Sequence, residues 1–287
     1  MRYVAPNSIQ DMVHLLAEEK GISRILAGGT DVLVQLRAGM VEPDLMVDIK
    51  SIDGMRDISP ENGGFRIGAA VSGAELGEHE RVKALWPGVV EAFELIGSTQ
   101  VQGRATMTGN LCNGSPAADS VPALFAADAI IHIAGPDGER SCPVADIPLS
   151  PGKISLSKGE IVTAISLPAR PERSSDAYQR FIPRTEMDIA VASAGISLTL
   201  DADGICTAAK VSLGAVAPTV LLVEDAANCL IGTKLDDDTL EKMGAACSAV
   251  ANPIDDKRGT IEFRTQVVAV LAKRVAALAY NRAGGRS

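Results

Sequence analysis

Two stretches of small and hydrogen-bonding residues carry most of the chemistry that this sequence offers. The first, which we call the glycine turn, consists of Leu26, Ala27, Gly28, Gly29, Thr30, Asp31, Val32 and Leu33. Paired glycines let a ligand approach backbone N–H groups closely. The start of a helix after them adds unpaired N–H donors and the positive end of the helix dipole. A turn of this kind is suited to binding phosphate.

The second stretch, which we call the threonine segment, consists of Thr106, Met107, Thr108, Gly109 and Asn110, and a run of small polar residues continues from it to Asp119. This density of Thr, Ser, Asn and Gly predicts a poor helix and a poor core, but it supplies hydroxyl and amide groups to a polar ligand. Two interpretations of Asp119 stay open. Its carboxylate accepts hydrogen bonds from ligand hydroxyls, or it caps the helix that follows.

Together the two stretches favour a long diphosphate ligand that is held from two sides. The chain has neither the G-x-x-x-x-G-K-[ST] sequence of a P-loop nor the G-x-G-x-x-G sequence of a Rossmann fold. Neither stretch contains Lys or Arg, so N–H dipoles and hydroxyl groups would have to meet the negative charge, at about 0.3–1 kcal/mol for each helix end. An ordinary strand-to-helix turn is the alternative interpretation of Gly28 and Gly29.

The other chemistry-bearing residues indicate no second site. The three histidines, His14, His79 and His132, do not stand beside a Ser or Cys in a nucleophile motif, and surface or core positions explain them best. The five cysteines are scattered without a C-x-x-C pair, which favours reduced core thiols over disulfides, structural zinc or an iron–sulfur cluster. The chemistry would therefore have to reside in a bound cofactor.

The composition is typical of a soluble protein with more than one unit. The chain has 287 residues, and 46% of them are hydrophobic, which is enough for packed cores. Its net charge is −9 and no basic block occurs, which argues against nucleic acid and anionic membranes as partners. The chain begins with no signal-like leader and contains no apolar run near the ~20 residues of a membrane span. We therefore expect a cytoplasmic protein.

Hydrophobic periodicity and turn residues predict the elements that must position the two stretches. Around the glycine turn we expect a helix at 9–20 capped by Ser8, a strand at 22–27, a helix at 31–37 and a buried strand at 45–49. Further along we expect a strand at 65–71, helices over 79–95 interrupted at Pro87, a short helix at 122–127, strands at 129–134 and 161–167, a linker at 168–175, a hairpin of 189–200 with 205–213, and helices at 237–251 and 260–283. These elements suggest three units: 1–55, 56–170 and 171–287.

The two stretches resemble the FAD-binding subunit of molybdenum hydroxylases, a family that includes the medium subunit of carbon monoxide dehydrogenase and the flavin part of xanthine dehydrogenase. Further matching landmarks follow in the same order over the full chain: residues 115–119, 159–162, 184–190, 213–218 and 258–264. The resemblance implies an α+β fold. Two α/β subdomains would form the p-cresol methylhydroxylase-type FAD-binding fold, followed by a C-terminal α+β domain.

By this resemblance, the glycine turn and the threonine segment hold the diphosphate of noncovalently bound FAD. Asp119 is expected to bind the adenosine portion or hydroxyls on the flavin side, and the Val162 backbone to contact the adenine region. Arg180 stands where many members have a Lys near the flavin, and it keeps the charge but not the shape. The family segment usually reads T-x-G-G-N, and Thr108 replaces its first glycine here.

The resemblance also implies a role for the chain. A large partner subunit with molybdopterin oxidises the substrate, and a small partner subunit with two [2Fe–2S] clusters passes electrons to FAD in this chain. From FAD they reach NAD or another acceptor, and the complex is expected to be a dimer of heterotrimers. Two alternatives stay open: a stand-alone flavin oxidoreductase of the same fold, and a nucleotide-binding scaffold subunit without redox work. The first would need a substrate-side acid or base, which we do not find in the sequence.

Overall fold

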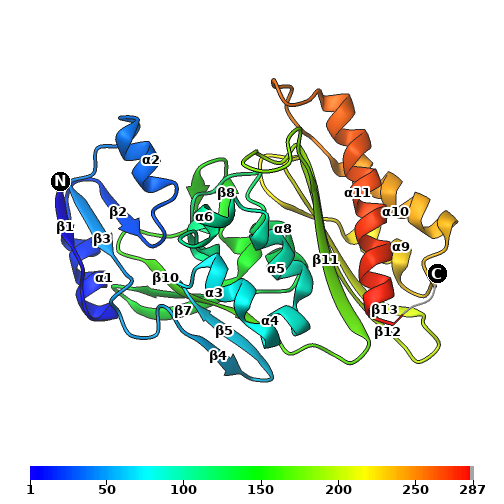
Figure 1. Ribbon diagram of the computed structural model, residues 1–287, viewed down its shortest axis with the longest axis horizontal. Helices are drawn as coiled ribbons and strands as arrows, with labels where there is room; N and C mark the ends of the chain where they lie inside the picture. The colour runs from blue at the N-terminus through cyan, green and yellow to red at the C-terminus, as the bar shows by residue number, and fades with distance from the viewer. Residues whose placement is uncertain (285–287) are drawn as a thin grey trace.

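Within residues 1–284, which the computed structural model describes, three larger β-sheets follow one another along the long axis of the molecule (Figure 1). A three-stranded sheet lies at the N-terminal end, a five-stranded sheet in the middle and a four-stranded sheet towards the C-terminal end. Helices pack against each of them. This mixture confirms the predicted α+β fold class.

The three-stranded sheet is parallel, with β3 at its centre. Its unit contains β1 (Arg2–Val4), α1 (Ile9–Glu18), β2 (Ser23–Leu26), α2 (Val32–Arg37) and β3 (Leu45–Asp48). All residues of β3 are buried, as is usual for a parallel strand with a neighbour on each side. Ser8 accepts the Asp11 N–H and caps α1 as predicted, although the helix ends at Glu18 rather than at residue 20.

The five-stranded sheet is antiparallel in the order β4-β5-β10-β6-β7. Its unit contains β4 (Ile58–Glu61), β5 (Gly64–Gly68), α3 (Gly73–Glu78), α4 (Glu80–Leu85), α5 (Pro87–Glu94), α6 (Thr99–Gln102), α7 (Met107–Cys112), α8 (Ser120–Ala126), β6 (Ile130–Gly135), β7 (Gly138–Pro143), a 3-10 turn (Val144–Asp146), the short pair β8 (Pro148–Ser150) and β9 (Lys153–Ile154), and β10 (Ile161–Leu167). Pro87 is the first residue of α5, where its missing N–H has no cost, so the predicted interruption is confirmed.

The threonine segment forms helix α7, and the prediction that it makes a poor helix was wrong. The Thr106 hydroxyl accepts the Gly109 N–H at 2.9 Å and caps the helix. Met107, Thr108 and Leu111 are buried. The cap and the buried face outweigh the weak helix propensities of Thr, Gly and Asn.

The four-stranded sheet is antiparallel in the order β11-β12-β13-β14. Its unit contains β11 (Ser174–Phe181), β12 (Ala192–Leu200), β13 (Cys206–Gly214), β14 (Leu221–Leu222), α9 (Glu224–Leu230), α10 (Asp237–Val250) and α11 (Ile261–Arg282). The predicted hairpin, now β12 with β13, and the two predicted helices, now α10 and α11, are confirmed. Strands β11 and β14 and helix α9 were not predicted, and β11 begins inside the expected linker.

Helix α8 connects the middle and C-terminal sheets. The Ser212 hydroxyl of β13 donates to the Pro122 carbonyl of α8 at 2.5 Å. The backbone of Gly195 in β12 lies so close to α8 that a Cβ there would come within 2.8 Å of the same carbonyl. These contacts fix the C-terminal sheet against the middle of the molecule, while the proposed boundaries of the three units stay a prediction. No helix among residues 1–284 is long and apolar enough to cross a membrane.

Candidate functional site

A cleft of about 620 Å³ brings the two stretches together. Ala27, Gly28, Gly29, Thr30, Asp31 and Val32 of the glycine turn line it, together with Thr106, Thr108, Gly109 and Asn110 of the threonine segment. Val162 of β10 also lines the cleft. The volume lies within the roughly 300–1,000 Å³ that is usual for small-molecule and cofactor pockets. The structure therefore joins residues that are nearly eighty positions apart in the chain.

Gly28 and Gly29 are needed for the packing of the two stretches as well as for access to the backbone. A Cβ on Gly28 would lie 2.0 Å from the carbonyl oxygen of Arg104 and 3.0 Å from the Ala105 Cα. Gly29 has a φ of +80°, which side chains of L residues rarely adopt. Backbone thus rests directly on backbone where the glycine turn meets the residues before α7.

Two helix starts leave N–H groups free at the cleft. In α2 the Leu33 N–H bonds to the Gly29 carbonyl at 3.1 Å, and in α7 the Asn110 N–H bonds to the Thr106 carbonyl at 2.9 Å. The N–H groups of Thr30 and Thr108, which precede these bonds, make no hydrogen bond within the described part of the chain. Helix starts with free N–H groups favour anions. The Thr108 side chain lines the cleft and does not disturb α7.

The cleft also contains cations that the sequence reasoning missed. Arg24 of β2 and Lys158, in the loop before β10, both line it. Arg140 holds that loop through two hydrogen bonds to Glu160, at 2.6 and 2.9 Å, and the Ser157 N–H donates to the same carboxylate at 2.8 Å. The landmark at 159–162 pointed to the loop, but no signal in the sequence placed Arg24 near it. The cleft therefore holds positive side chains in addition to the dipoles and hydroxyls that the two stretches were expected to supply.

Polar and acidic side chains complete the wall. The Gln35 side chain of α2 donates to the Asn113 side chain, directly after α7, at 3.4 Å. This hydrogen bond joins the residues that follow the glycine turn to those that follow the threonine segment. Desolvation raises the pKa of Asp31, which also lines the cleft. Among residues 1–284 no group of three or more His, Cys, Asp or Glu side chains is placed to hold a metal ion. The wall of the cleft therefore combines amide, hydroxyl and carboxyl groups with the cations Arg24 and Lys158.

Two ends of the glycine turn lie outside the cleft. Leu26 and Leu33 are absent from its wall, and a Cβ on Gly29 would be 3.0 Å from the Cδ1 atom of each. Both leucines therefore pack beside Gly29 and support the turn rather than line the cleft.

Asp119 and Arg180 form a buried pair away from the cleft. Arg180 donates to one carboxylate oxygen of Asp119, and the Tyr178 hydroxyl donates to the other at 2.7 Å. Neither Asp119 nor Arg180 lines the cleft. Asp119 has helical backbone angles and makes no cap hydrogen bond. The cap interpretation of Asp119 is wrong, because its carboxylate turns towards β11, which was not predicted. Its expected contact with ligand hydroxyls stays a prediction.

The Asp119 pair predicts a pH effect on stability. Burial raises the pKa of Asp119 to about 6, and Arg180 and Tyr178 oppose only part of that rise. A raised pKa means that folding favours the protonated carboxyl, so this contribution to stability is complete below pH 4 and is lost as the pH rises through 6. Relative to Asp119→Asn, the wild-type chain should lose about 3 kcal/mol of unfolding free energy in total, of which about 2 kcal/mol falls between pH 4.5 and 8. Urea unfolding of both proteins from pH 4.5 to 8 measures it, and a pH-independent difference would contradict the assignment.

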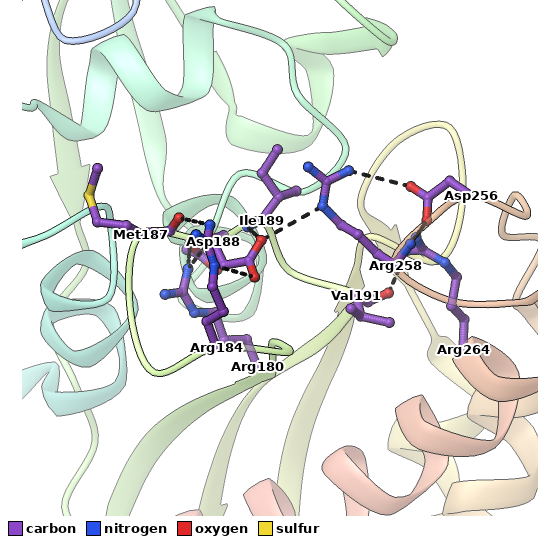
Figure 2. A network of polar contacts seen from close by, with 10 residues as sticks. Arg180, Arg184, Met187, Asp188, Ile189, Val191, Asp256, Arg258 and Arg264 are labelled. Atoms are coloured by element: carbon purple, nitrogen blue, oxygen red, sulfur yellow. Dashed lines mark hydrogen bonds and ion pairs between the residues drawn. The ribbon is translucent and has the colours of Figure 1, made fainter.

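A second polar network fixes the loop between β11 and β12 (Figure 2). Arg184 donates to the Met187 carbonyl at 2.6 Å and to Asp188 at 3.1 Å. Arg258 lies 3.8 Å from Asp188 and 3.6 Å from Asp256, and Arg264 donates to Asp256 at 2.7 Å. The landmarks at 184–190 and 258–264 thus lie side by side, and their charged residues bind each other (Figure 2).

Comparison with known families decides what kind of protein has this fold and cleft. The family model for the FAD binding domain in molybdopterin dehydrogenase matches residues 1–170. This chain belongs to that family. A second model, for the C-terminal domain of the CO dehydrogenase flavoprotein, matches residues 177–279. The resemblance seen in the sequence is confirmed.

Named relatives agree with this family over almost the full chain. The carbon monoxide dehydrogenase medium chain of Afipia carboxidovorans is 32% identical, covering 98% of this chain and 97% of its own length. A putative xanthine dehydrogenase FAD-binding subunit of Escherichia coli is 31% identical, with 97% and 96% covered. A chain of the reconstituted CO dehydrogenase from Oligotropha carboxidovorans superposes with a TM-score of 0.94 at 31% identity, with 98% of both chains covered. Because these relatives are dehydrogenase subunits, the family member described here is an oxidoreductase subunit.

Proposed function

We propose that this chain is the FAD-containing electron-transfer subunit of a multi-subunit molybdenum hydroxylase. In this proposal it takes electrons from [2Fe–2S] clusters of a small partner subunit and delivers them to NAD or another acceptor. A large partner subunit with molybdopterin selects and oxidises the substrate. The observation that supports the proposal best is that the glycine turn and the threonine segment line the same cleft.

The residues of the cleft fit FAD. A dinucleotide such as FAD has two linked phosphates in its middle. The cleft offers free N–H groups at two helix starts, one after the glycine turn and one in the threonine segment. Arg24 and Lys158 supply positive charge. Gly28 and Gly29 present bare backbone to the ligand. In this proposal residues 27–32, Thr106 and residues 108–110 hold the diphosphate, and Val162 contacts the adenine region.

The chain's own contribution is positioning. Bound FAD supplies the redox chemistry, and the protein holds it, orients it and limits its contact with water. Leu26 and Leu33 support the glycine turn from outside the cleft, and the Asp119–Arg180 pair supports the segment between α7 and α8. Relatives named as medium chains suggest assembly with a large and a small subunit, and we propose a dimer of such heterotrimers.

The flavin content of the purified complex tests this proposal. The complex that contains this chain should show flavin absorbance, release FAD and not FMN on denaturation, and contain molybdenum and iron with two further polypeptides. Removing Arg24 and Lys158 together, as Arg24→Gln/Lys158→Gln, should weaken FAD binding and reduce its salt dependence, because fewer cations then face the phosphates. A well-folded complex without extractable flavin would contradict the proposal.

Reduction of the flavin in the isolated chain and in the assembled complex separates the two alternatives. Reduction of the flavin by a substrate added to the isolated chain would favour a stand-alone flavin oxidoreductase. A flavin that stays oxidised in the assembled complex, while the partner clusters are reduced, would favour a scaffold subunit. Rapid mixing with absorbance detection distinguishes these outcomes.

A further inference from the structure

The side chains of Tyr3, Asp48 and Lys50 form a chain of hydrogen bonds beside the glycine turn. Tyr3 lies on β1, Asp48 is the last residue of β3 and Lys50 follows it. β3 runs beside β2, with Asp48 opposite Leu26, and the Ile49 N–H bonds to the Leu26 carbonyl at 3.2 Å. Lys50 therefore emerges where the turn begins. The ordinary explanation of a lysine here would be a solvated strand end, but its side chain is only 29% exposed.

Each donor of the Lys50 ammonium group has a partner. Its Nζ atom donates to the Ala27 carbonyl at 3.1 Å and to the two carboxylate oxygens of Asp48 at 2.7 and 2.8 Å. The Tyr3 hydroxyl donates to one of the same Asp48 oxygens at 2.7 Å. Burial acts to raise the pKa of Asp48, but the hydrogen bonds from Lys50 and Tyr3 outweigh it and lower that pKa. Asp48 is therefore charged at neutral pH and holds Lys50 in place.

We propose that Lys50 is a positioning residue for FAD binding, because it fixes the peptide between Ala27 and Gly28. In a planar trans peptide the carbonyl of one residue and the N–H of the next point in opposite directions. Lys50 holds the Ala27 carbonyl, so the Gly28 N–H points away from Lys50. That N–H makes no hydrogen bond within the described residues, and Gly28 lines the cleft. The inference rests on the proposed FAD site and adds to it the group that orients one of its donors.

Gly28 gives this peptide a particular need for a restraint. Glycine has no side chain to limit rotation of its backbone, so a turn with Gly28 and Gly29 has two flexible residues in sequence. The carbonyl of Arg104 limits Gly28 on one side, and Lys50 limits the preceding peptide on the other. Tyr3 and Asp48 extend that restraint to β1, the edge strand on the far side of β3 from β2.

The test compares Lys50→Met with Lys50→Arg in the full chain within its complex. Lys50→Met removes the donor to Ala27 and should raise the Kd for FAD about tenfold, equal to about 1.4 kcal/mol. Lys50→Arg keeps a charged donor and should restore most of the affinity, and Tyr3→Phe should have a smaller effect than Lys50→Met. Lys83→Met is the matched control, since it breaks the exposed Lys83–Glu94 pair of 2.9 Å away from the cleft and should leave the Kd unchanged.

Hydrogen exchange provides a readout that does not depend on FAD. Without FAD, the amides of Leu33, Gln35 and Ile49, which are hydrogen-bonded to the carbonyls of Gly29, Asp31 and Leu26, should exchange faster in Lys50→Met, while those of β12 and α11 stay as in the wild type. If Lys50→Met does not fold, Asp48→Asn/Lys50→Met removes the pair without leaving an unpaired charge. Unchanged Kd and unchanged exchange in a folded variant would overturn the inference. Failure of the wild-type complex to bind FAD would instead overturn the proposed function, and the exchange result would still decide whether Lys50 holds the turn.

Discussion

Replacing Gly28 by valine is expected to abolish tight FAD binding, with an increase in Kd of at least about 100-fold, or 2.7 kcal/mol. The new Cβ would start 2.0 Å from the Arg104 carbonyl oxygen and 2.7 Å from its carbon. Both are backbone atoms, so no change of side-chain rotamer can relieve the overlap. The glycine turn and the residues before α7 must move apart, and overpacking of this kind also costs about 1–3 kcal/mol of stability. Titration with FAD and thermal unfolding of the variant measure the two effects.

Gly103→Ala is the matched control for this substitution. Gly103 lies next to Arg104, has a φ of −61°, and a Cβ there would meet its nearest atom at an ordinary 3.6 Å. This variant should bind FAD like the wild type and unfold at the same or a slightly higher temperature. If Gly28→Val binds FAD with wild-type affinity, the close approach of the two stretches does not shape the site.

Arg170→Met is expected to destabilise the fold by about 3–5 kcal/mol, because it leaves the buried carboxylate of Asp176 without its cation. Arg170 donates to Asp176 at 2.6 Å and to the Leu85 carbonyl at 2.7 Å, and its guanidinium group lies 4.0 Å from the ring centre of Trp86. Both members of the ion pair are almost fully buried. Asp176 also accepts the Val89 N–H at 3.0 Å, so the pair joins α4 and α5 to β11. Chemical unfolding of the full chain measures the loss.

Two further variants separate the loss of charge pairing from a general effect of the substitution. Arg170→Met/Asp176→Leu removes both charges and should recover a large part of the lost stability, because desolvation raises the pKa of Asp176 and lowers that of Arg170 and so opposes the pair. Lys83→Met breaks an exposed ion pair between α4 and α5 and should change the unfolding free energy by only about 0–1 kcal/mol. A double variant as unstable as Arg170→Met would show that packing against Trp86, not the charge, stabilises this region.

Local signals in the sequence were sufficient for much of the fold. Ser8 caps α1, Pro87 interrupts the helices over 79–95, and the turn at 201–204 joins β12 to β13, as predicted. Each of these features depends on a few neighbouring residues, so its physics is contained in a short window of sequence. The composition of the glycine turn and the threonine segment singled out two stretches that line one cleft.

The sequence alone failed where a residue's partner lies far along the chain. The sequence left open whether Asp119 caps a helix, and the structure shows that its carboxylate instead accepts hydrogen bonds from Tyr178 and Arg180 of β11. The threonine segment has weak helix propensity, and it is helical because tertiary packing buries Met107 and Leu111. Neither β11 nor the buried face of α7 is visible in a short window, because both depend on contacts that form only in the folded chain.

For the cleft itself, the sequence determined which residues could bind a diphosphate, and the tertiary structure decided how these residues are arranged around it. Gly28 is visible in the sequence, but its close approach to the backbone of Arg104 is not. Arg24, Lys50 and Lys158 lie outside both stretches, and only the parallel pairing of β2 with β3 and the loop before β10 bring them to the turn. Charge acts through space over a few ångströms, so the cations of a site need not be neighbours in sequence. The types of the residues in the two stretches therefore predicted a diphosphate ligand, and the fold added the cations and the Lys50 contact beside them.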